Sequence, residues 1–254
     1  MIRLHQVEKR YGRFQALHPL SLDVRPGEIF GFLGPNGAGK TTTIRMLAGV
    51  LVPTAGRIEI DGIDIVAQPV ESRRRIGYIP DRPYLYDKLT AREFLRFVGG
   101  IYGMSPEDVR GRGDQLLAEH GLIERADELV EAYSHGMKQR LVLSAALLHS
   151  PRVLIVDEPM VGLDPQGARR IKDRFREIAR SGRTVFLCTH SLDTAQEVCD
   201  RVGILYKGRL VALDTVDNLV RTAGLAHLEE VFLRITEEEA SAAGQARPGA
   251  WEDA

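Results

Sequence analysis

The sequence predicts an α/β protein with a mixed sheet core, an antiparallel β subdomain near the N-terminus and a helical lobe inserted into the core. Short strands broken by turns dominate residues 2–29, and helical patterning dominates residues 88–150. After residue 150, apolar strands alternate with helices, which is typical of a parallel sheet covered on both faces. The chain has 254 residues, 44% of them hydrophobic, so it can bury the core of one large domain.

The N-terminal strands are separated by turns. Residues 2–29 contain breaks at Tyr11-Gly12 and Pro26-Gly27, and residues 28–33 read as a buried strand. A glycine-rich loop at 34–39 then leads into a predicted helix over 40–49. A further short strand is expected at 57–60.

The inserted lobe and the second half of the core follow in order. The predicted lobe helices cover 91–101, 106–121 and 137–149. The core then continues with a strand at 153–156, a helix at 165–180 and a strand at 184–188. We expect one domain over residues 1–236. Residues 237–254 are rich in Glu, Ala, Gly and Ser and are expected to form a flexible tail.

Bulk properties narrow the class of protein. The 34 basic and 35 acidic side chains give a net charge of −1, which does not favour nucleic acid as a partner. Met1 leads directly into a strand pattern, and no window approaches the ~18 apolar residues of a membrane helix. Cys188 and Cys199 have no metal-ligand spacing. We therefore expect a cytoplasmic protein with reduced thiols. If it works at a membrane, another chain must hold it there.

The glycine-rich loop carries the most specific signal. Its sequence, Gly-Pro-Asn-Gly-Ala-Gly-Lys-Thr, fits G-x-x-x-x-G-K-[ST] and lies between a predicted strand and a predicted helix. In such loops the backbone N–H groups surround phosphate oxygens, Lys40 reaches the β- and γ-phosphates, and the Thr41 hydroxyl ligates Mg²⁺. The residues expected to contact the nucleotide here are Gly34, Asn36, Gly37, Ala38, Gly39, Lys40, Thr41 and Thr42.

Two acids end a buried strand further along the chain. Asp157 and Glu158 follow the apolar run at 153–156, and ligands of open α/β sheets bind at the carboxyl ends of strands. Asp157 is therefore a candidate for holding Mg²⁺, and Glu158 for polarising the water that attacks the γ-phosphate. Alone, such a pair is as often a solvated loop; beside the phosphate loop, the catalytic role is favoured.

With these motifs in order, residues 2–236 resemble an ATP-binding-cassette nucleotide-binding domain, which has a P-loop NTPase (RecA-like) fold. The segment at 133–140 resembles the family signature Leu-Ser-Gly-Gly-Gln. The resemblance implies that Ser134 and Gly136 face the γ-phosphate of ATP held by a second nucleotide-binding subunit, either an identical or a related chain. Alone, the segment would more often be a plain helix capped by serine, but its order and spacing among the other motifs favour the signature.

Other positions match the family residue by residue. The resemblance places Tyr11 against adenine, although a tyrosine packed in the core is the alternative. It places Asp164, within Gly162-Leu163-Asp164, at the dimer interface. It also makes His190 the switch histidine that contacts the γ-phosphate, so that Glu158, His190 and Lys40 form the catalytic set.

Three positions depart from the family pattern. His135 and Met137 replace a glycine and the glutamine of the signature, in a form that is similar to family members serving exporters. Asp81 stands where glutamine is usual, and we expect it to approach Mg²⁺ through water. The weakly matching segment at 228–234 resembles a closing helix of drug- and polysaccharide-exporter types.

The resemblance implies an ATP-hydrolysing subunit that drives a separate transmembrane permease, in the export direction, from the cytoplasmic face of the membrane. Aromatic residues at Pro83-Tyr84-Leu85-Tyr86 would form a docking groove for that permease. The alternative for these aromatics is packing within the lobe. The alternative function is a soluble ATP-driven switch or assembly scaffold. The sequence shows neither the long coiled-coil inserts nor the second cassette of two such kinds of protein, which argues against them.

Overall fold

The computed structural model describes residues 1–82, 84–160 and 163–245. Its first sheet is antiparallel and comes mostly from the N-terminal segment. In spatial order it contains β2 (Phe14–Val24), β1 (Ile2–Tyr11), β4 (Ala55–Ile60) and β5 (Ile63–Asp64). This sheet is the predicted antiparallel subdomain.

The second sheet is the mixed core. In spatial order it contains β10 (Arg209–Thr215), β9 (Arg201–Tyr206), β3 (Ile29–Leu33), β8 (Thr184–Cys188), β7 (Val153–Asp157) and β6 (Ile76–Ile79). Strands β9, β3, β8, β7 and β6 are parallel, and β10 joins β9 antiparallel at the edge. The mixed α/β fold predicted from the sequence is confirmed.

Two hydrophobic clusters lie on the two faces of this core sheet, and the alternation of side chains along each strand explains both. On β3, Phe30 and Phe32 point toward the antiparallel sheet, where they pack with Ile44 of α1 (Lys40–Leu47). Ile29 and Leu33 belong to the opposite cluster. Since the strands are buried on both faces, they read in sequence as continuous apolar runs.

The opposite cluster joins the sheet to the helical lobe. The lobe helices are α3 (Ala91–Ile101), α4 (Pro106–Glu119) and α5 (His135–Leu147), with single 3-10 turns at Ile123–Arg125 and Val130–Ala132. Thr90 and Glu93 form a capping box at the start of α3, and Ser105 caps α4. These caps explain why the helices begin where they do. Further helices are α2 (Pro69–Arg74), α6 (Pro165–Arg180) and α7 (Leu192–Val198).

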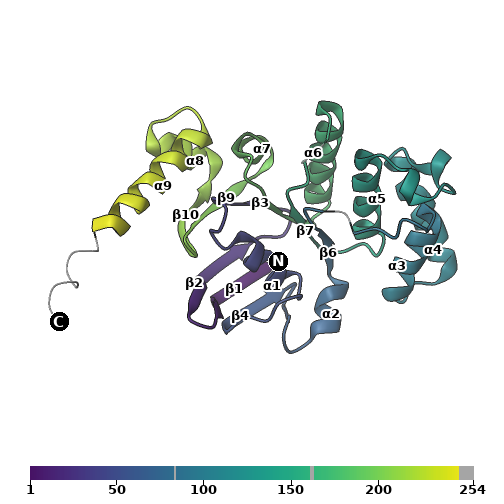
Figure 1. The fold of residues 1–254 in the computed structure, drawn as a ribbon, viewed down its shortest axis with the longest axis horizontal. Helices are drawn as coiled ribbons and strands as arrows, with labels where there is room; N and C mark the ends of the chain where they lie inside the picture. Colours follow the sequence, from purple (N-terminus) through teal and green to yellow (C-terminus); the bar gives the residue numbers. More distant parts are fainter. Residues whose placement is uncertain (83, 161–162, 246–254) are drawn as a thin grey trace, which may run out of the picture.

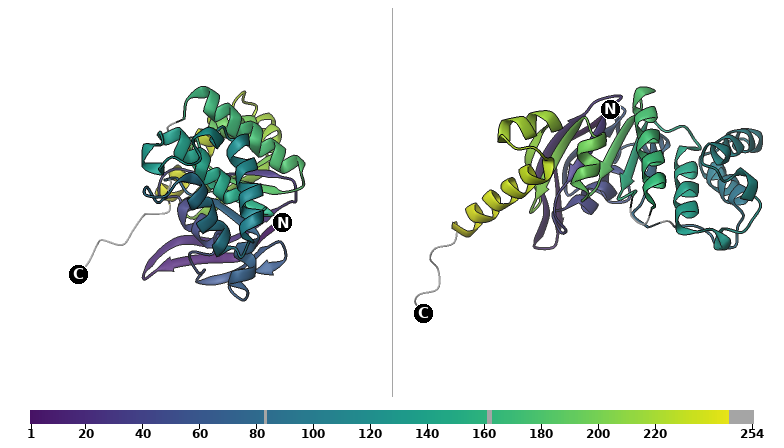
Figure 2. Two further views of the ribbon diagram at one scale, coloured as in Figure 1. Left: turned by 90° about the vertical axis from the view of Figure 1, so that its right-hand side faces the viewer. Right: turned by 90° about the horizontal axis from the view of Figure 1, so that it is seen from above.

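The C-terminal helices lie at the far end of the sheet from the lobe, as two views at right angles show (Figures 1 and 2). They are α8 (Val216–Ala223) and α9 (Leu228–Gln245). The prediction of a flexible tail from residue 237 is wrong over 237–245, because α9 continues through this stretch. Leu228 and Val231 anchor the helix on the core, and the Glu- and Ala-rich stretch then extends it at low cost. Residues 246–254 lie outside the described residues.

In the described part of the chain, no helix combines the length and apolar character needed to cross a membrane.

Candidate functional site

The phosphate loop connects β3 to α1 and is shaped by its glycines. Gly37 and Gly39 have φ of 79° and 107°, which side chains rarely adopt. A Cβ on Gly39 would approach the Ala16 carbonyl oxygen to 2.8 Å, so the loop fits closely against β2. Gly39 is also the N-cap of α1 and has no side chain to accept from the first-turn N–H groups. Those N–H groups, including those of Thr41 and Thr42, are left for an anion.

Lys40 is buried and folded back over the same loop. Its Nζ donates to the carbonyl oxygens of Gly34 at 2.5 Å and Pro35 at 3.1 Å. The ammonium is therefore held above the loop that carries Asn36 and Ala38. A phosphate oxygen entering this loop would meet a cation that is already in place.

The carboxyl ends of three adjacent strands bring the predicted chemistry together. Strand β8 lies between β3 and β7, with Cys188 paired to Phe32 on one side and to Asp157 on the other. The phosphate loop, Asp157 and the residues after β8 therefore share one edge of the sheet. This edge is where ligands of open α/β sheets bind.

Asp157 is a buried carboxylate in an electrostatically unfavourable place. Burial raises its pKa above the ordinary value, while a hydrogen bond from the Cys188 thiol opposes the rise and the charges of Asp81 and Glu158 add to it. Tyr78 lies nearby, where burial and then the charges of Asp157 and Asp81 raise its pKa to about 12. A bound cation would relieve these carboxylates.

The donor set fits Mg²⁺. Among the described residues no group of three or more His, Cys, Asp or Glu side chains could hold a metal ion by itself. Mg²⁺ is usually bound by one or two carboxylates together with phosphate oxygens and water, so a protein cage is not required. Asp157 and the Thr41 hydroxyl are residue types suited to that role. Asp81 is exposed, follows β6 and accepts a hydrogen bond from the Arg82 N–H at 2.9 Å.

Glu158 is held in an unusual backbone conformation. Its φ is 49°, uncommon for a residue with a side chain, and its N–H donates to the Cys188 carbonyl at 2.9 Å. Its Oε1 accepts from the His190 N–H at 2.8 Å and lies 2.7 Å from His190 Nδ1. Its Oε2 accepts from the Thr189 hydroxyl at 3.1 Å. The structure thus brings Glu158 and His190 together. They follow strands β7 and β8, whose last residues, Asp157 and Cys188, are 31 positions apart in the sequence.

Tyr11 lies at the tip of the β1–β2 hairpin. Its side chain is 47% exposed and the Lys9 ammonium lies 5.3 Å from its ring centroid. Phe14 faces it across the turn and is also exposed. The packing of β2 on Gly39 places this hairpin beside the phosphate loop. The alternative of a tyrosine packed in the core does not hold.

The signature segment lies at the start of α5, on the lobe. Ser134 is exposed and caps the helix, accepting from the Met137 N–H at 3.3 Å. Ser134 and Gly136 line a pocket of about 240 Å³ together with Asp164, which caps α6 by accepting from the Gly167 N–H at 2.7 Å. Among the described residues, this pocket's lining includes none of the phosphate loop. Gly162 lies outside the described residues.

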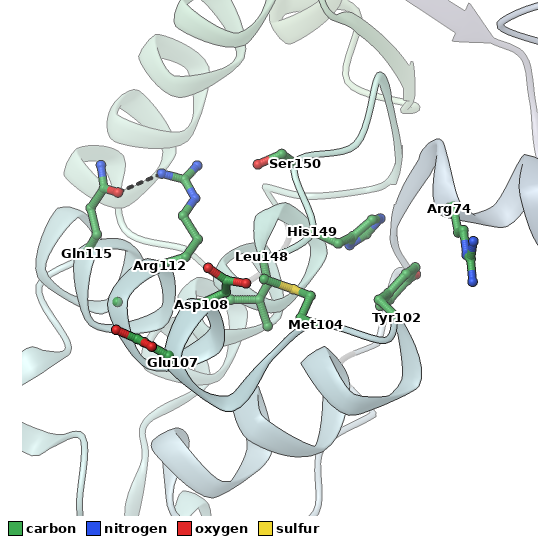
Figure 3. Close-up of a pocket in the computed structure, with 11 residues that line it drawn as sticks. Arg74, Tyr102, Met104, Glu107, Asp108, Arg112, Gln115, Leu148, His149 and Ser150 are labelled. Carbon is green, nitrogen blue, oxygen red and sulfur yellow. Dashed lines mark hydrogen bonds between the residues drawn. The ribbon is translucent and has the colours of Figure 1, made fainter.

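Two features of this edge were missed from the sequence, the Thr189 hydroxyl on Glu158 and the Cys188 thiol on Asp157. Only their position at the end of an apolar strand, next to His190, could have indicated them. A pocket of about 610 Å³ lies away from this edge, between α4 and the end of α5 (Figure 3). In it the Tyr102 ring stacks on His149, with ring centroids 3.6 Å apart.

Comparison with known proteins decides the family. The family model described as ABC transporter matches residues 17–161. The chain belongs to the ABC transporter family. A linearmycin resistance ATP-binding protein of Bacillus subtilis is 37% identical over 88% of this chain and 72% of its own length. A Nod factor export ATP-binding protein of Paraburkholderia xenovorans is 40% identical over 91% of this chain and 76% of its own length.

Solved structures agree with this assignment. An ATP-binding subunit of an ABC transporter superposes with a TM-score of 0.87 at 35% identity, over 93% of this chain and 99% of that one. A dimeric, post-hydrolysis ATP-binding cassette with ADP and Pi gives a TM-score of 0.77 at 27% identity, over 85% of this chain and 98% of that one. This ABC protein is therefore an ATP-binding subunit and an ATPase, and the likeness does not favour the alternative of a soluble scaffold.

Proposed function

We propose that the chain is the motor of an exporter, and that two subunits close around two ATP molecules. The observation that supports this is the division of the site. Lys40, Glu158 and His190 lie at the sheet edge, whereas Ser134 and Gly136 line a separate pocket between the start of α5 and the start of α6. A second subunit placed head to tail would bring one subunit's pocket to the other's phosphate loop. The dimeric neighbour with ADP and Pi is consistent with this arrangement.

Binding would use residues around the whole loop. The glycine N–H groups, Lys40, Thr41 and Thr42 would contact the phosphates, and Tyr11 would stack on the adenine. Mg²⁺, when bound, would neutralise charge on the β- and γ-phosphate oxygens. Thr41 and Asp157 would hold it, with Asp81 reaching it through water.

The chemistry would fall to Glu158 and His190. Glu158 Oε2 would take a proton from the attacking water, because it carries one hydrogen bond whereas Oε1 carries two contacts from His190. His190 uses Nδ1 on Glu158 and has a side chain that is 66% exposed, so its Nε2 edge is open to the γ-phosphate. With Lys40, it would stabilise charge on the phosphoryl group as it transfers.

The permease would dock on aromatic side chains at the base of the lobe. Tyr84 and Tyr86 are 79% and 57% exposed, and the Tyr86 ring packs edge-on against Phe97 of α3 at 5.3 Å. Ile101, one turn along α3, is exposed as well. Tyr86 packs on the lobe, as the alternative expectation had it, and its exposed part supports the proposed docking surface. Pro83 lies outside the described residues.

Export from the cytoplasmic face is the direction we propose, since named relatives serve resistance and Nod factor export. The permease, and not this chain, would select the cargo. The second nucleotide-binding subunit is either an identical copy or a related chain.

The Glu158→Gln variant tests this proposal. It should bind ATP with unchanged affinity, lose turnover by about 10²- to 10³-fold and accumulate an ATP-bound dimer, measured by light scattering. Glu124→Gln, an exposed acid of the lobe, is the matched control and should behave as the unmodified protein. Normal turnover by Glu158→Gln would remove Glu158 from the mechanism. A variant that binds ATP and stays monomeric would point to a related second chain.

A further inference from the structure

The last residue of β8 and the two residues that follow it contact the Glu158 carboxylate or backbone. The Cys188 carbonyl accepts from the Glu158 N–H, the Thr189 hydroxyl contacts Oε2, and the backbone N–H and ring Nδ1 of His190 both contact Oε1. Thr189 is buried, with 2% of the residue's surface exposed. The carboxylate is therefore fixed at both oxygens by neighbours from one short segment.

The direction of the Thr189 hydrogen bond follows from its second partner. The Ser191 N–H donates to Thr189 Oγ1 at 3.0 Å. An ionised carboxylate can only accept, so the single hydroxyl proton points to Glu158 Oε2. Thr189 is thus an oriented donor.

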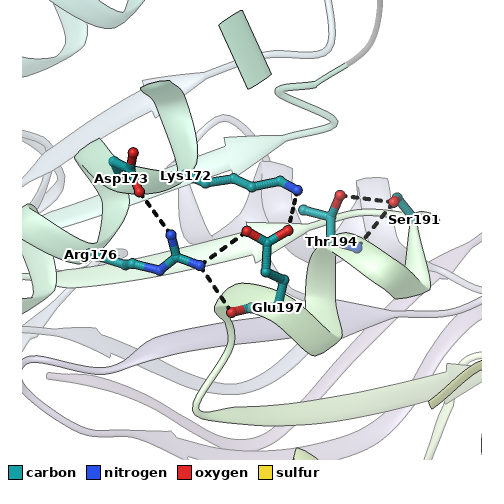
Figure 4. A network of polar contacts seen from close by, with 6 residues as sticks. All are labelled: Lys172, Asp173, Arg176, Ser191, Thr194 and Glu197. Atoms are coloured by element: carbon teal, nitrogen blue, oxygen red, sulfur yellow. Dashed lines mark hydrogen bonds and ion pairs between the residues drawn. The ribbon is translucent and has the colours of Figure 1, made fainter. Parts of the chain in front are cut away.

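The segment that orients Thr189 is itself held firmly. Ser191 caps α7, accepting from the Thr194 N–H at 3.3 Å. At the other end of α7, Glu197 bonds to Lys172 and Arg176 of α6 (Figure 4). The hydroxyl is therefore positioned by a helix that is braced against its neighbour.

We propose that Thr189 is a positioning residue that aims Glu158 Oε2 at the attacking water; this rests on the proposed role of Glu158 as the base. His190 contacts only Oε1 of the two carboxylate oxygens. Because the terminal torsion angle of a glutamate side chain has a broad distribution, Oε2 needs a contact of its own to stay in place. The left-handed backbone at Glu158 persists only where its surroundings hold it, which makes the site sensitive to lost contacts. Misplacing a catalytic group lowers turnover without weakening substrate binding.

Two substitutions at this position separate orientation from packing. Thr189→Val keeps the shape and removes the hydroxyl, and we expect kcat to fall about 10-fold with KM and ATP affinity unchanged. Thr189→Ser keeps the hydroxyl and should restore kcat to within about threefold of the unmodified protein. Nucleotide affinity is measured by calorimetry with a non-hydrolysable ATP analogue, and thermal unfolding verifies that both variants fold.

A double variant completes the test. In the Glu158→Gln background, Thr189→Val should cause no further loss of residual turnover, because the group that it positions is already gone. Unmodified kcat in Thr189→Val, or an equal loss in Val and Ser, would overturn the proposal. Normal turnover of Glu158→Gln alone would instead overturn the proposed base.

Discussion

The nucleotide edge of the sheet and the helical lobe both bury polar side chains, but to different ends. At the edge, the buried Lys40, Asp157 and Thr189 line the place where the nucleotide would bind. In the lobe, the half-buried His120 and the buried Ser144 bond to each other at 2.7 Å and join α4 to α5. Buried polarity thus serves chemistry in one region and helix packing in the other. Substitutions at the edge should therefore lower turnover with little change in stability, and substitutions of buried polar residues in the lobe should change stability with little effect on turnover.

The same physical cause shifts pKa values in both regions. Burial disfavours charge, so it raises the pKa of Asp157 and lowers the pKa of His120 to about 4. Asp157 can regain a partner when a cation binds. No such partner stabilises a protonated His120, because its buried Nε2 has no hydrogen-bond partner among the described residues. The positive charges of Arg174, Arg140 and Arg112 lower its pKa further.

The largest effect is expected at the edge, from Lys40→Ala. Removing the ammonium should lower turnover by about 10²- to 10³-fold and weaken ATP binding, because Lys40 hydrogen-bonds to the Gly34 and Pro35 carbonyls and so holds its positive charge at the loop. The measurements are steady-state hydrolysis and nucleotide affinity. Thermal unfolding should change little.

Lys88→Ala is the matched control from the lobe. Lys88 is exposed and pairs with Glu131 at 2.5 Å, so its loss should leave turnover of the isolated protein unchanged. A comparable loss of turnover in both variants would break the distinction between the two regions.

The second effect belongs to the lobe and concerns acid stability. The Ser144 hydroxyl donates to the Arg140 carbonyl, so His120 Nδ1 carries the proton that Ser144 Oγ accepts. Below pH 6.5 the unfolded chain binds a proton at His120, whereas the folded protein resists it down to about pH 4. The neutral His120 therefore contributes its full share to the free energy of unfolding above pH 6.5. As the pH falls from 6.5 to 4, this contribution decreases by about 1.4 kcal/mol per pH unit, roughly 3 kcal/mol in all.

The His120→Asn variant checks this by urea unfolding at several pH values. Asparagine keeps a donor near Nδ1 and does not titrate, so the decline between pH 6.5 and 4 should become shallower by that amount. His5→Asn, at an exposed position on β1, should leave the decline unchanged. An identical decline in both variants would show that His120 does not cause it.

The sequence predicts the residues of the edge and the helices of the lobe, but not the polar contacts between elements. The edge residues are accessible because they lie in contiguous motifs. The phosphate loop occupies eight successive residues, and Asp157-Glu158 follow one apolar strand, so both can be read without the fold. The contact between Thr189 and Glu158 depends on β7 pairing with β8, which no local pattern contains. His120 needs α4 and α5 packed together before its burial exists. The end of α9 was missed because a helix started by packing continues through residues whose composition alone favours disorder.

The smallest effect should come from weakening the ion pairs between α6 and α7, which lie outside both the nucleotide edge and the helical lobe. Glu197 is half-exposed, and its hydrogen bond from Lys172, ahead of that from Arg176, lowers its pKa. Exposed pairs contribute little, so Glu197→Gln should destabilise the protein by no more than about 1 kcal/mol, and by less in high salt. Because the cap at Ser191 remains, turnover should fall less than about twofold. Glu229→Gln, an exposed acid on α9, is the control in both assays. A loss of turnover as large as that of Thr189→Val would mean that the α6–α7 contact, and not the local hydrogen bond, aims Glu158, and the edge would then depend on ion pairs far outside it.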